Sequence, residues 1–416
     1  MSQEVFVQPV GAPRRLQLYG VSRARSACTY YRIRVPFIAL ENLGAVSYKI
    51  DDFETMEKQA RVDWAMASDI HLHYLAADAL ILDRIRDFKK LKPTYNRDIH
   101  AFTYPPKVVF DADDDAESVD CWNPRFVRLG TRAPDGTPLK PGDQIFMEMG
   151  EGAEPKPYWI DGRTYGDGQT FDIAENIALF ERMGDIIKES HGCTVTSEEL
   201  AKVYRERYES DNVFVSPNSI LFDDFPDIRL KSHGKRINIL WQGGWSHYRD
   251  LYPLRESFGR VARKYPQANF MFWGQQFRWM SSDIPPSQRD YIDWVPFDAY
   301  HLRLATIGHD INLAPLANSP FNRCKSAIKF YESASLPRPV PTLAANVGPY
   351  KEIEHGDTGM LYDSPKEFEE HLGTLIEDAS LRKDMGQRAK EWVHTYRDAH
   401  ITSPALLEFY RSMQDG

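Results

Sequence analysis

The order of apolar and polar positions along the chain predicts strands that alternate with amphipathic helices, most clearly in the second half. Residues 237–241 form a short apolar run followed by Gly243 and Gly244, and apolar residues then recur every three or four positions from Leu251 to Tyr265. This pattern is typical of a strand, a glycine turn and a helix. Similar patterns predict further strands at residues 270–273, 292–295, 311–316 and 340–343 and further helices at residues 325–335, 365–378 and 381–396.

The first half repeats this pattern with one interruption. It predicts strands at residues 16–20, 69–74, 107–111, 193–197 and 213–216 and helices at residues 31–43 and 171–187. Between about residues 116 and 170 the periodicity is lost among Pro, Gly and polar residues, with Trp122 and Trp159 among them. So long a stretch without periodicity is either a functional insertion or a surface loop that only covers the domain.

The alternation predicts the α/β fold class, with two Rossmann-like, doubly wound domains, because parallel strands need helical crossovers. A chain of 416 residues is also too long for one hydrophobic core. We expect an N-terminal domain at residues 1–225 with an insertion at about 116–170, a C-terminal domain at 236–398, and a final helix within 399–416 that packs back on the first domain. Ligands bind beyond the carboxyl ends of parallel strands, so we expect the active site in a central cleft between the two sheets.

Composition excludes several classes of protein. With 42% hydrophobic and 27% charged residues and no apolar run near 18 residues, the chain is predicted to fold without a membrane span. The net charge of -9 argues against a general affinity for nucleic acid, which needs clustered cations. We find no secretory signal, and the 4 cysteines fit neither a zinc site nor a disulfide framework, so we expect a cytoplasmic protein.

One local charge pattern points in the other direction. Residues 5–40 contain no Asp or Glu, whereas the same segment carries Arg14, Arg15, Arg23, Arg25, Arg32 and Arg34. An acid-free, arginine-rich segment in an acidic protein suggests a local anion site. Surface arginines that are only solvated would give the same pattern.

The most informative segment is residues 322–332. In a helix, Lys325, Lys329 and Glu332 lie on one narrow stripe. Two lysines four residues apart repel each other unless an anion lies beside them, and a phosphate at the start of a helix also gains from the helix dipole. Glu332 can accept two hydrogen bonds from a ribose diol. An ordinary solvated helix face is the alternative interpretation.

Residues 322–332, with Gly348-Pro349-Tyr350 and residues 352–361, resemble the donor half of GT-B glycosyltransferases of the family 4 type. In those proteins a helix that ends in a Glu follows the nucleotide-sugar site, and a Gly-x-Thr-Gly turn closes the domain. Residues 241–251 resemble the strand, glycine turn and His-x-x-Asp-Leu of a subgroup often carried by phages and bacteria, and His247 is the histidine of that motif.

The first half resembles the same enzymes more weakly. Residues 26–36 look like the loop and helix start that these enzymes place under the sugar diphosphate, and residues 111–115 resemble an acidic turn after a central strand. Residues 195–200 and 215–220 look like the last strands before the linker. The order of these segments, more than any one of them, supports the resemblance.

Two positions depart from the family pattern. Family 4 enzymes usually carry two acidic residues eight positions apart on the donor helix, and Cys324 stands where the first would be. Pro337 stands where a glycine usually follows the helix. Because the missing acid ordinarily helps to hold the donor sugar, the sugar stays open, and a non-catalytic nucleotide-sugar or glycan-binding protein is an alternative.

The resemblance implies a glycosyltransferase that moves a sugar from a UDP- or GDP-sugar to an acceptor hydroxyl, with retention of configuration and without a metal or other required cofactor. Cations and backbone N–H groups would stabilise the departing diphosphate. The residues expected to bind the donor are Gly243, Gly244, His247, Arg249, Lys325, Ser326, Lys329, Glu332 and Arg25. The candidate catalytic residues are Lys325, Lys329, Asp114 and His73.

Other features leave alternatives open. His71 and His73 lie on one face of a predicted strand. They could act as a base near the cleft, bind a metal together or be ordinary structural histidines. The carboxylates of residues 111–115 would suit a divalent cation, but the family works without one, so we expect Asp114 to face the acceptor instead.

The acceptor and the oligomeric state are not determined by the sequence. A protein or glycan acceptor would use Trp122 and Trp159 as aromatic platforms, whereas a modified base in phage DNA would have to be flipped into the cleft. A phage-encoded enzyme would work in the host cytoplasm. A sugar-nucleotide epimerase on the same two-domain frame is a further alternative, since it needs no acceptor.

Overall fold

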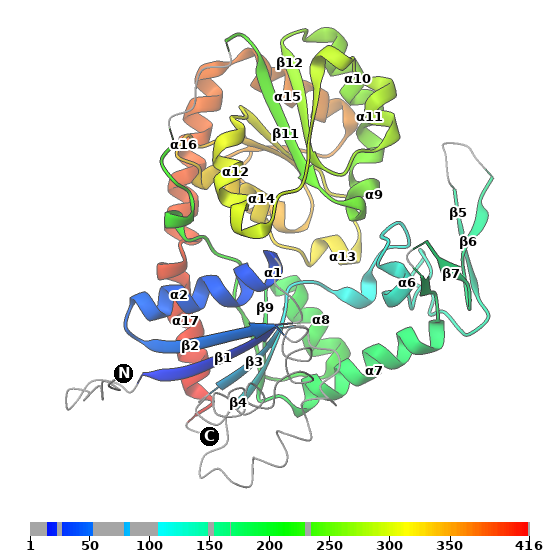
Figure 1. Ribbon diagram of the computed structural model, residues 1–416, viewed down its shortest axis with the longest axis vertical. Helices are drawn as coiled ribbons and strands as arrows, with labels where there is room; N and C mark the ends of the chain where they lie inside the picture. The colour runs from blue at the N-terminus through cyan, green and yellow to red at the C-terminus, as the bar shows by residue number, and fades with distance from the viewer. Residues whose placement is uncertain are drawn as a thin grey trace.

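The computed structural model describes residues 15–22, 27–52, 79–83, 107–148, 154–166, 168–228 and 234–414. These residues form two lobes, each built on a parallel sheet of six described strands (Figure 1). We call residues 15–228 with the C-terminal helix the N lobe, and residues 234–398 the C lobe. The predicted α/β class and the two doubly wound units are confirmed.

The N-lobe sheet has the strand order β10-β9-β4-β3-β1-β2. Its strands are β1 (Leu16–Ser22), β2 (Val46–Asp52), β3 (Ala79–Asp83), β4 (Lys107–Ala112), β9 (Gly192–Val195) and β10 (Val213–Val215). The helices of this lobe are α1 (Ala27–Thr29), the π-helical segment η1 (Tyr30–Arg34), α2 (Val35–Asn42), α7 (Ile173–Glu189) and α8 (Glu198–Tyr208). Side-chain caps start the last two, because Asp172 and Ser197 accept from the backbone N–H groups of Glu175 and Leu200. The predicted strand at 69–74 lies outside the described residues.

The segment at 116–170 is more regular than its sequence indicates. It contains η3 (Ala116–Ser118), α6 (Phe126–Leu129) and the antiparallel pairs β5 (Gln144–Met147) with β6 (Lys156–Ile160) and β7 (Thr164–Tyr165) with β8 (Gln169–Thr170). Phe126, Trp159 and Phe171 pack together in one buried cluster. The sequence shows no periodicity here because strands this short contain too few alternations to be recognised.

The C-lobe sheet has the order β13-β12-β11-β14-β15-β16. Its strands are β11 (Ile237–Gly243), β12 (Ala268–Gly274), β13 (Arg289–Ile292), β14 (Ile311–Ala314), β15 (Thr342–Ala345) and β16 (Met360–Tyr362). The longer helices are α10 (Arg255–Lys264), α12 (Tyr300–Ile307), α14 (Ile328–Ser335), α15 (Pro365–Glu377) and α16 (Ala379–Tyr396). Shorter helical turns are η5 (Trp245–His247), α9 (Tyr248–Leu251), η6 (Tyr252–Leu254), α11 (Arg278–Asp283), η7 (Pro286–Gln288), η8 (Phe297–Ala299), α13 (Pro320–Arg323) and η9 (Gly348–Glu352).

Two predicted C-lobe elements differ from the structure. The strand predicted at 292–295 lies three residues earlier, because its apolar end, Val295, follows the strand instead of forming it. The helix predicted at 325–335 begins only at Ile328, as α14, and Lys325 and Ser326 lie in the turn between α14 and the short helix α13, which ends at Arg323. Ala327, the residue before α14, has a non-helical ψ of 33°, so the helix starts after it and not at Lys325.

The chain crosses between the lobes twice at neighbouring positions. The chain runs from the N lobe towards the C lobe past Ile220 and returns past Arg397. The N–H of Ile220 donates to the carbonyl of Arg397 at 2.8 Å. The last helix, α17 (Ala399–Ser412), then runs beside α2 in the N lobe (Figure 1). Its side chains Leu406 and Tyr410 share a buried cluster with Leu18 and Phe37.

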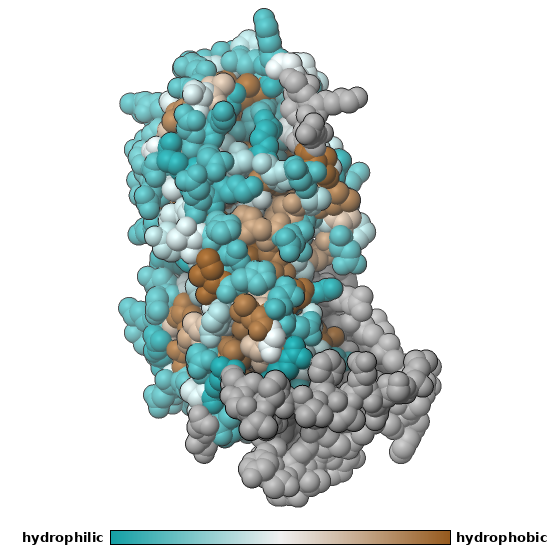
Figure 2. Space-filling model, turned by 90° about the vertical axis from the view of Figure 1, so that its left-hand side faces the viewer, coloured by the Kyte–Doolittle hydropathy of each residue, from teal (hydrophilic) through white to brown (hydrophobic). Residues whose placement is uncertain are grey.

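The lobes also share a core and present a mixed surface. Tyr31, Val35 and Ala39 of the N lobe belong to the same buried cluster as the C-lobe sheet. Figure 2 shows one face on which apolar residues are interspersed among hydrophilic ones. Within the described ranges, no helix combines the length and the apolar character that a membrane crossing requires.

Candidate functional site

The site is built around the end of β11, where the strand runs into Gly243 and Gly244. A Cβ atom on Gly243 would meet His247 Cδ2 at 2.8 Å and Trp241 Cζ2 at 2.7 Å, so only glycine lets these rings pack here. A Cβ atom on Gly244 would meet no described atom within 4 Å. The turn therefore exposes backbone beside an imidazole at the carboxyl end of the sheet, where parallel sheets bind ligands.

His247 is held as a neutral ring. Its Nδ1 lies 2.7 Å from Asp250 Oδ2, while Asp250 Oδ1 accepts from the Ala317 N–H and the Asn322 amide. Burial lowers the pKa of His247 to about 4, and Lys329 acts in the same direction. Burial alone would raise the pKa of Asp250, but the contact with His247, the charge of Lys325 and the Ala317 N–H together outweigh this, and the pKa is lowered. Because an ionised Asp250 can only accept, Nδ1 carries the proton and Nε2 can accept a hydrogen bond from a ligand.

Two lysines face the same region. Lys329, in the first turn of α14, has its Nζ 5.9 Å from the centre of the Trp241 ring, and Lys325 Nζ lies 4.6 Å from that of Phe321. Burial lowers the pKa of Lys329 to about 8, and the positive charge of Lys325 contributes to this shift. The first N–H groups of a helix lack intrahelical partners, so cations and N–H groups converge where α14 begins. This arrangement suits an anion.

Glu332, one turn further along α14, is buried with only 3% of its surface exposed. Its Oε1 accepts from the Tyr31 hydroxyl at 2.6 Å, and its Oε2 accepts from the Tyr300 hydroxyl at 2.7 Å and the Gln242 amide at 3.2 Å. Burial raises the pKa of Glu332 to about 7, although these hydrogen bonds oppose the shift. Both carboxylate oxygens of the residue expected to bind ribose thus already accept hydrogen bonds within the protein.

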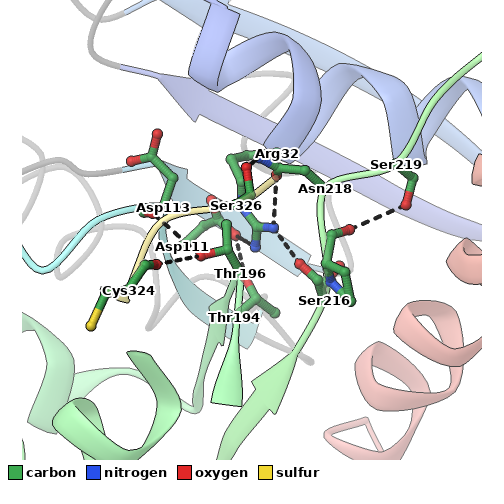
Figure 3. Close-up of polar contacts among 11 residues, drawn as sticks. Arg32, Asp111, Asp113, Thr194, Thr196, Ser216, Asn218, Ser219, Cys324 and Ser326 are labelled. Atoms are coloured by element: carbon green, nitrogen blue, oxygen red, sulfur yellow. Dashed lines mark hydrogen bonds and ion pairs between the residues drawn. The ribbon is translucent and has the colours of Figure 1, made fainter. Parts of the chain in front are cut away.

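The turn between α13 and α14 is held by the N lobe (Figure 3). Asn218 donates its amide to Ser326 Oγ at 2.9 Å, and the Thr196 and Ser197 hydroxyls donate to the Cys324 carbonyl at 3.3 Å. The Cys324 side chain is buried in the N-lobe cluster that also contains Phe321. Ser326, which the sequence analysis assigns to donor binding, therefore also joins the lobes.

The comparisons with known proteins identify this architecture. No protein-family model matches the chain, and no curated protein matches it in sequence. Sucrose-phosphate synthase from Thermosynechococcus elongatus has 10% identity and a TM-score of 0.59, over 96% of this chain and 99% of that one. Anabaena HepE, solved in complex with UDP-glucose, has 11% identity and a TM-score of 0.55, over 96% and 100%. The chain has the GT-B fold.

A third similar structure is that of an S. aureus TarM variant in complex with Fondaparinux, alpha-GlcNAc-glycerol and UDP. It has 10% identity and a TM-score of 0.53, over 83% of this chain and 58% of that one. The present chain thus spans somewhat more than half of the length of TarM. At these identities the likeness shows the GT-B fold, and activity has to be argued from the site.

The acidic turn after β4 is divided between structural roles and a small cavity in this GT-B protein. Asp111 pairs with Arg32, with the guanidinium NH2 2.7 Å from Oδ1, and both side chains are buried. Asp115 pairs with Arg207. Asp114 lines an enclosed cavity of about 30 Å³ together with Arg125 of the N lobe and Phe321 of the C lobe, a group that forms no metal site. In the described part of the chain, no group of three His, Cys, Asp or Glu side chains could hold a metal ion.

Several sequence candidates have different surroundings from those expected. Arg249, considered for the diphosphate, forms an ion pair with Asp120 of the N lobe. Trp159 is no exposed platform, because it is 5% exposed and its Nε1 donates to the Cys121 carbonyl at 2.8 Å. Trp122 stacks on Tyr248 of the C lobe at a ring distance of 5.5 Å. These tertiary contacts, of which those of Arg249 and Trp122 cross between the lobes, could not be predicted from local spacing.

The structure also changes the interpretation of the arginine-rich segment. Arg32 is neutralised by Asp111, and Arg15 donates to the carbonyl of Gly44. The prediction of an anion site is therefore wrong for Arg32, because tertiary folding brings a carboxylate to a segment that contains none. Arg25 and His73, with Arg14, Arg23 and His71, lie outside the described residues.

The structure adds two tryptophans that the sequence analysis did not select. Trp245, after β11, and Trp294, after β13, are 58% and 55% exposed. Trp294 lies over Gly274, since a Cβ atom there would meet its Cζ2 at 2.3 Å. For Trp245 the available signal was its place after the glycine turn that follows a predicted strand, because such positions lie at the ligand-binding edge. Trp294 lay inside the strand predicted at 292–295, so the misplaced strand concealed it.

Proposed function

We propose that the protein is a glycosyltransferase that moves a sugar from a nucleotide diphosphate sugar to an acceptor hydroxyl. The fold supplies two sheets whose carboxyl ends carry the candidate residues, and the site supplies groups that match the parts of such a donor. In the proposed arrangement the C lobe binds the nucleotide and the N lobe presents the acceptor.

One observation carries the proposal. Among the described residues, neither Lys325 nor Lys329 has a carboxylate within ion-pair distance, although both lie beside the start of α14. Burial lowers the pKa of Lys329 more than the negative charges of Asp250 and Glu332 raise it, so its ammonium charge is only partly compensated. A bound diphosphate would supply the missing negative charge and would also accept from the helix N–H groups.

The same groups would promote transfer. As the bond between the anomeric carbon and the diphosphate oxygen breaks, negative charge grows on the leaving oxygen, and the two lysines stabilise it. The new bond forms to the acceptor oxygen, whose proton is released. The Nε2 atom of His247 accepts from a hydroxyl of the donor sugar. From the family resemblance we also propose that the transfer retains the configuration at the anomeric carbon and requires no metal.

Other side chains of the C lobe match the ribose and the nucleobase of the donor. Glu332 accepts the ribose hydroxyls, and the exposed ring of Trp294 offers a face on which a nucleobase can stack. HepE was solved with UDP-glucose and the TarM variant with UDP, which makes UDP-sugars the first donors to test and GDP-sugars the second.

We propose a glycan or another uncharged hydroxyl compound as the acceptor. A hollow of about 470 Å³ in the N lobe is lined by Phe180, Tyr208 and charged side chains. Two of these, Arg132 and Arg207, both pair with Glu117, so the hollow is not strongly positive. The alternative acceptor, a modified base in DNA, was supported mainly by the arginine-rich segment. That support is weakened because Arg32 of this segment is buried against Asp111.

Binding of UDP to the whole chain, measured by calorimetry, tests the proposed role of the lysines. Lys329→Ala should weaken UDP binding by about tenfold to a hundredfold, as expected for the loss of one charge-assisted hydrogen bond to phosphate. Lys366→Ala is the matched control, because this exposed C-lobe lysine pairs with Glu370. Equal affinities of the two variants would remove Lys329 from the site.

Activity needs a separate measurement. Incubation with UDP- and GDP-sugars and a panel of glycans, followed by mass spectrometry of the acceptor, should show a mass increase of one sugar residue. A donor converted without any acceptor would indicate the epimerase, and tight UDP binding without nucleotide release would indicate the non-catalytic binder.

A further inference from the structure

The carboxylate proposed for the ribose diol already has hydroxyl donors on both of its oxygens. Tyr31 donates to Glu332 Oε1 at 2.6 Å, and Tyr300 donates to Oε2 at 2.7 Å. A ribose diol would present two O–H donors to the same two oxygens. With Glu332 only 3% exposed, a diol cannot reach the carboxylate unless at least one tyrosine hydroxyl moves away.

Both hydroxyls have a second acceptor within reach. Tyr31 Oη lies 2.8 Å from His301 Nε2, and Tyr300 Oη lies 2.9 Å from Gln242 Oε1. Burial lowers the pKa of His301 to about 4, so its ring is neutral, and Nε2 can accept from Tyr31 in the tautomer that carries its proton on Nδ1. A tyrosine displaced from Glu332 can therefore keep a hydrogen bond, which lowers the cost of the exchange.

Of the two tyrosines, only Tyr31 belongs to the N lobe. It lies in η1, the π-helical segment Tyr30–Arg34, and π-helical turns frequently mark functional sites. The neighbouring Tyr30 also packs against the C lobe, with its ring centre 5.0 Å from that of Phe297, and its hydroxyl donates to Asp224. The segment thus places two consecutive tyrosines against the C lobe, and one of them contacts the donor site.

We propose that Tyr31 is a built-in competitor of the nucleotide. Its hydroxyl occupies, on Glu332, the position that a ribose hydroxyl takes, so nucleotide binding breaks this contact between the lobes. The inference rests on the proposed function, because it assigns the ribose to Glu332. It makes the strength of donor binding depend on an N-lobe residue that contacts no part of the donor.

The test compares UDP affinities of the full-length chain and its Tyr31→Phe variant by calorimetry. Phe keeps the packed ring and removes only the hydroxyl, so UDP should bind about tenfold more tightly, the equivalent of one hydrogen bond to a charged group. Tyr30→Phe is the matched control, since its hydroxyl contacts Asp224 instead of Glu332, and it should leave the affinity unchanged. A hydroxyl that only positions Glu332 predicts the opposite sign, weaker binding in Tyr31→Phe.

A second probe isolates the diol. With 2′,3′-dideoxy-UDP, which cannot donate to Glu332, Tyr31→Phe should bind no more tightly than the unmodified protein. For the unmodified chain, hydrogen exchange of residues 27–42 should become faster with saturating UDP, and this readout does not depend on the folding of a variant.

The outcomes separate the two proposals. Unchanged or weaker UDP binding by Tyr31→Phe overturns the competition alone, as does unchanged or slower exchange of residues 27–42. If neither UDP nor GDP binds the unmodified protein or any variant, the proposed function fails, and the competition fails with it.

Discussion

At the scale of single residues, the site depends on charges that the protein only partly neutralises. Lys329 shows this most clearly, because burial lowers its pKa from 10.5 to about 8. For the free protein, folding favours the neutral amine, so the stability that this group contributes is fully present above pH 10.5 and is lost as the pH falls through 8. A bound anion reverses this preference, because it stabilises the charged amine.

The pKa of Lys329 therefore predicts how donor binding changes with pH. The amine is charged below pH 8 and neutral above it, so UDP affinity should fall by about tenfold between pH 7 and pH 9.5. Lys329→Arg should remove most of this decrease, because a guanidinium stays protonated throughout the range. Calorimetry at several pH values checks both. An equally steep decrease in the arginine variant would show that another group causes the pH dependence of UDP affinity.

At the scale of elements, the turn between α13 and α14 explains why the helix predicted at 325–335 starts late. Thr196 and Asn218 of the N lobe donate hydrogen bonds to the Cys324 carbonyl and to Ser326 Oγ in this turn, and the Cys324 side chain is buried. Burial raises the pKa of the Cys324 thiol to about 12, and Asp115 and Glu199 contribute to this shift. A thiol fits this apolar, negative environment, whereas the acid usual in family 4 enzymes does not.

Replacing Cys324 with the usual acid should therefore destabilise the protein. Cys324→Glu would bury a carboxylate near Asp115 and Glu199, at a cost of about 3 kcal/mol or more in the free energy of unfolding. Cys324→Ala should cost less, because it leaves only a small cavity. Urea unfolding measures both. A glutamate variant as stable as the alanine variant would show that the side chain of residue 324 is not enclosed between the lobes.

At the scale of the whole molecule, the two lobes are joined by more than a linker. The paired crossings at Ile220 and Arg397, the packing of α17 on the N lobe and the contact of Tyr31 with Glu332 all span both parts. The N lobe therefore depends on the C-terminal residues of the chain for part of its core.

Truncation of one α17 side chain tests this dependence. Leu406→Ala, at a position 2% exposed, should lower the free energy of unfolding by about 2 to 5 kcal/mol. Ile401→Ala on the same helix, at a position 54% exposed, should change it by no more than about 0.5 kcal/mol. Thermal unfolding compares the two variants. Similar effects would contradict the packing of α17 on the N lobe.

The sequence by itself determined the α/β class, the two doubly wound units and the glycine turn at Gly243, because periodicity and turn residues report local burial and backbone shape. Only the tertiary structure decided that Arg32 meets Asp111, that Trp159 is buried and that Glu332 meets Tyr31. These partners lie far apart in the sequence. A buried polar group must find a partner, and the fold, not the spacing along the chain, determines which one comes within reach.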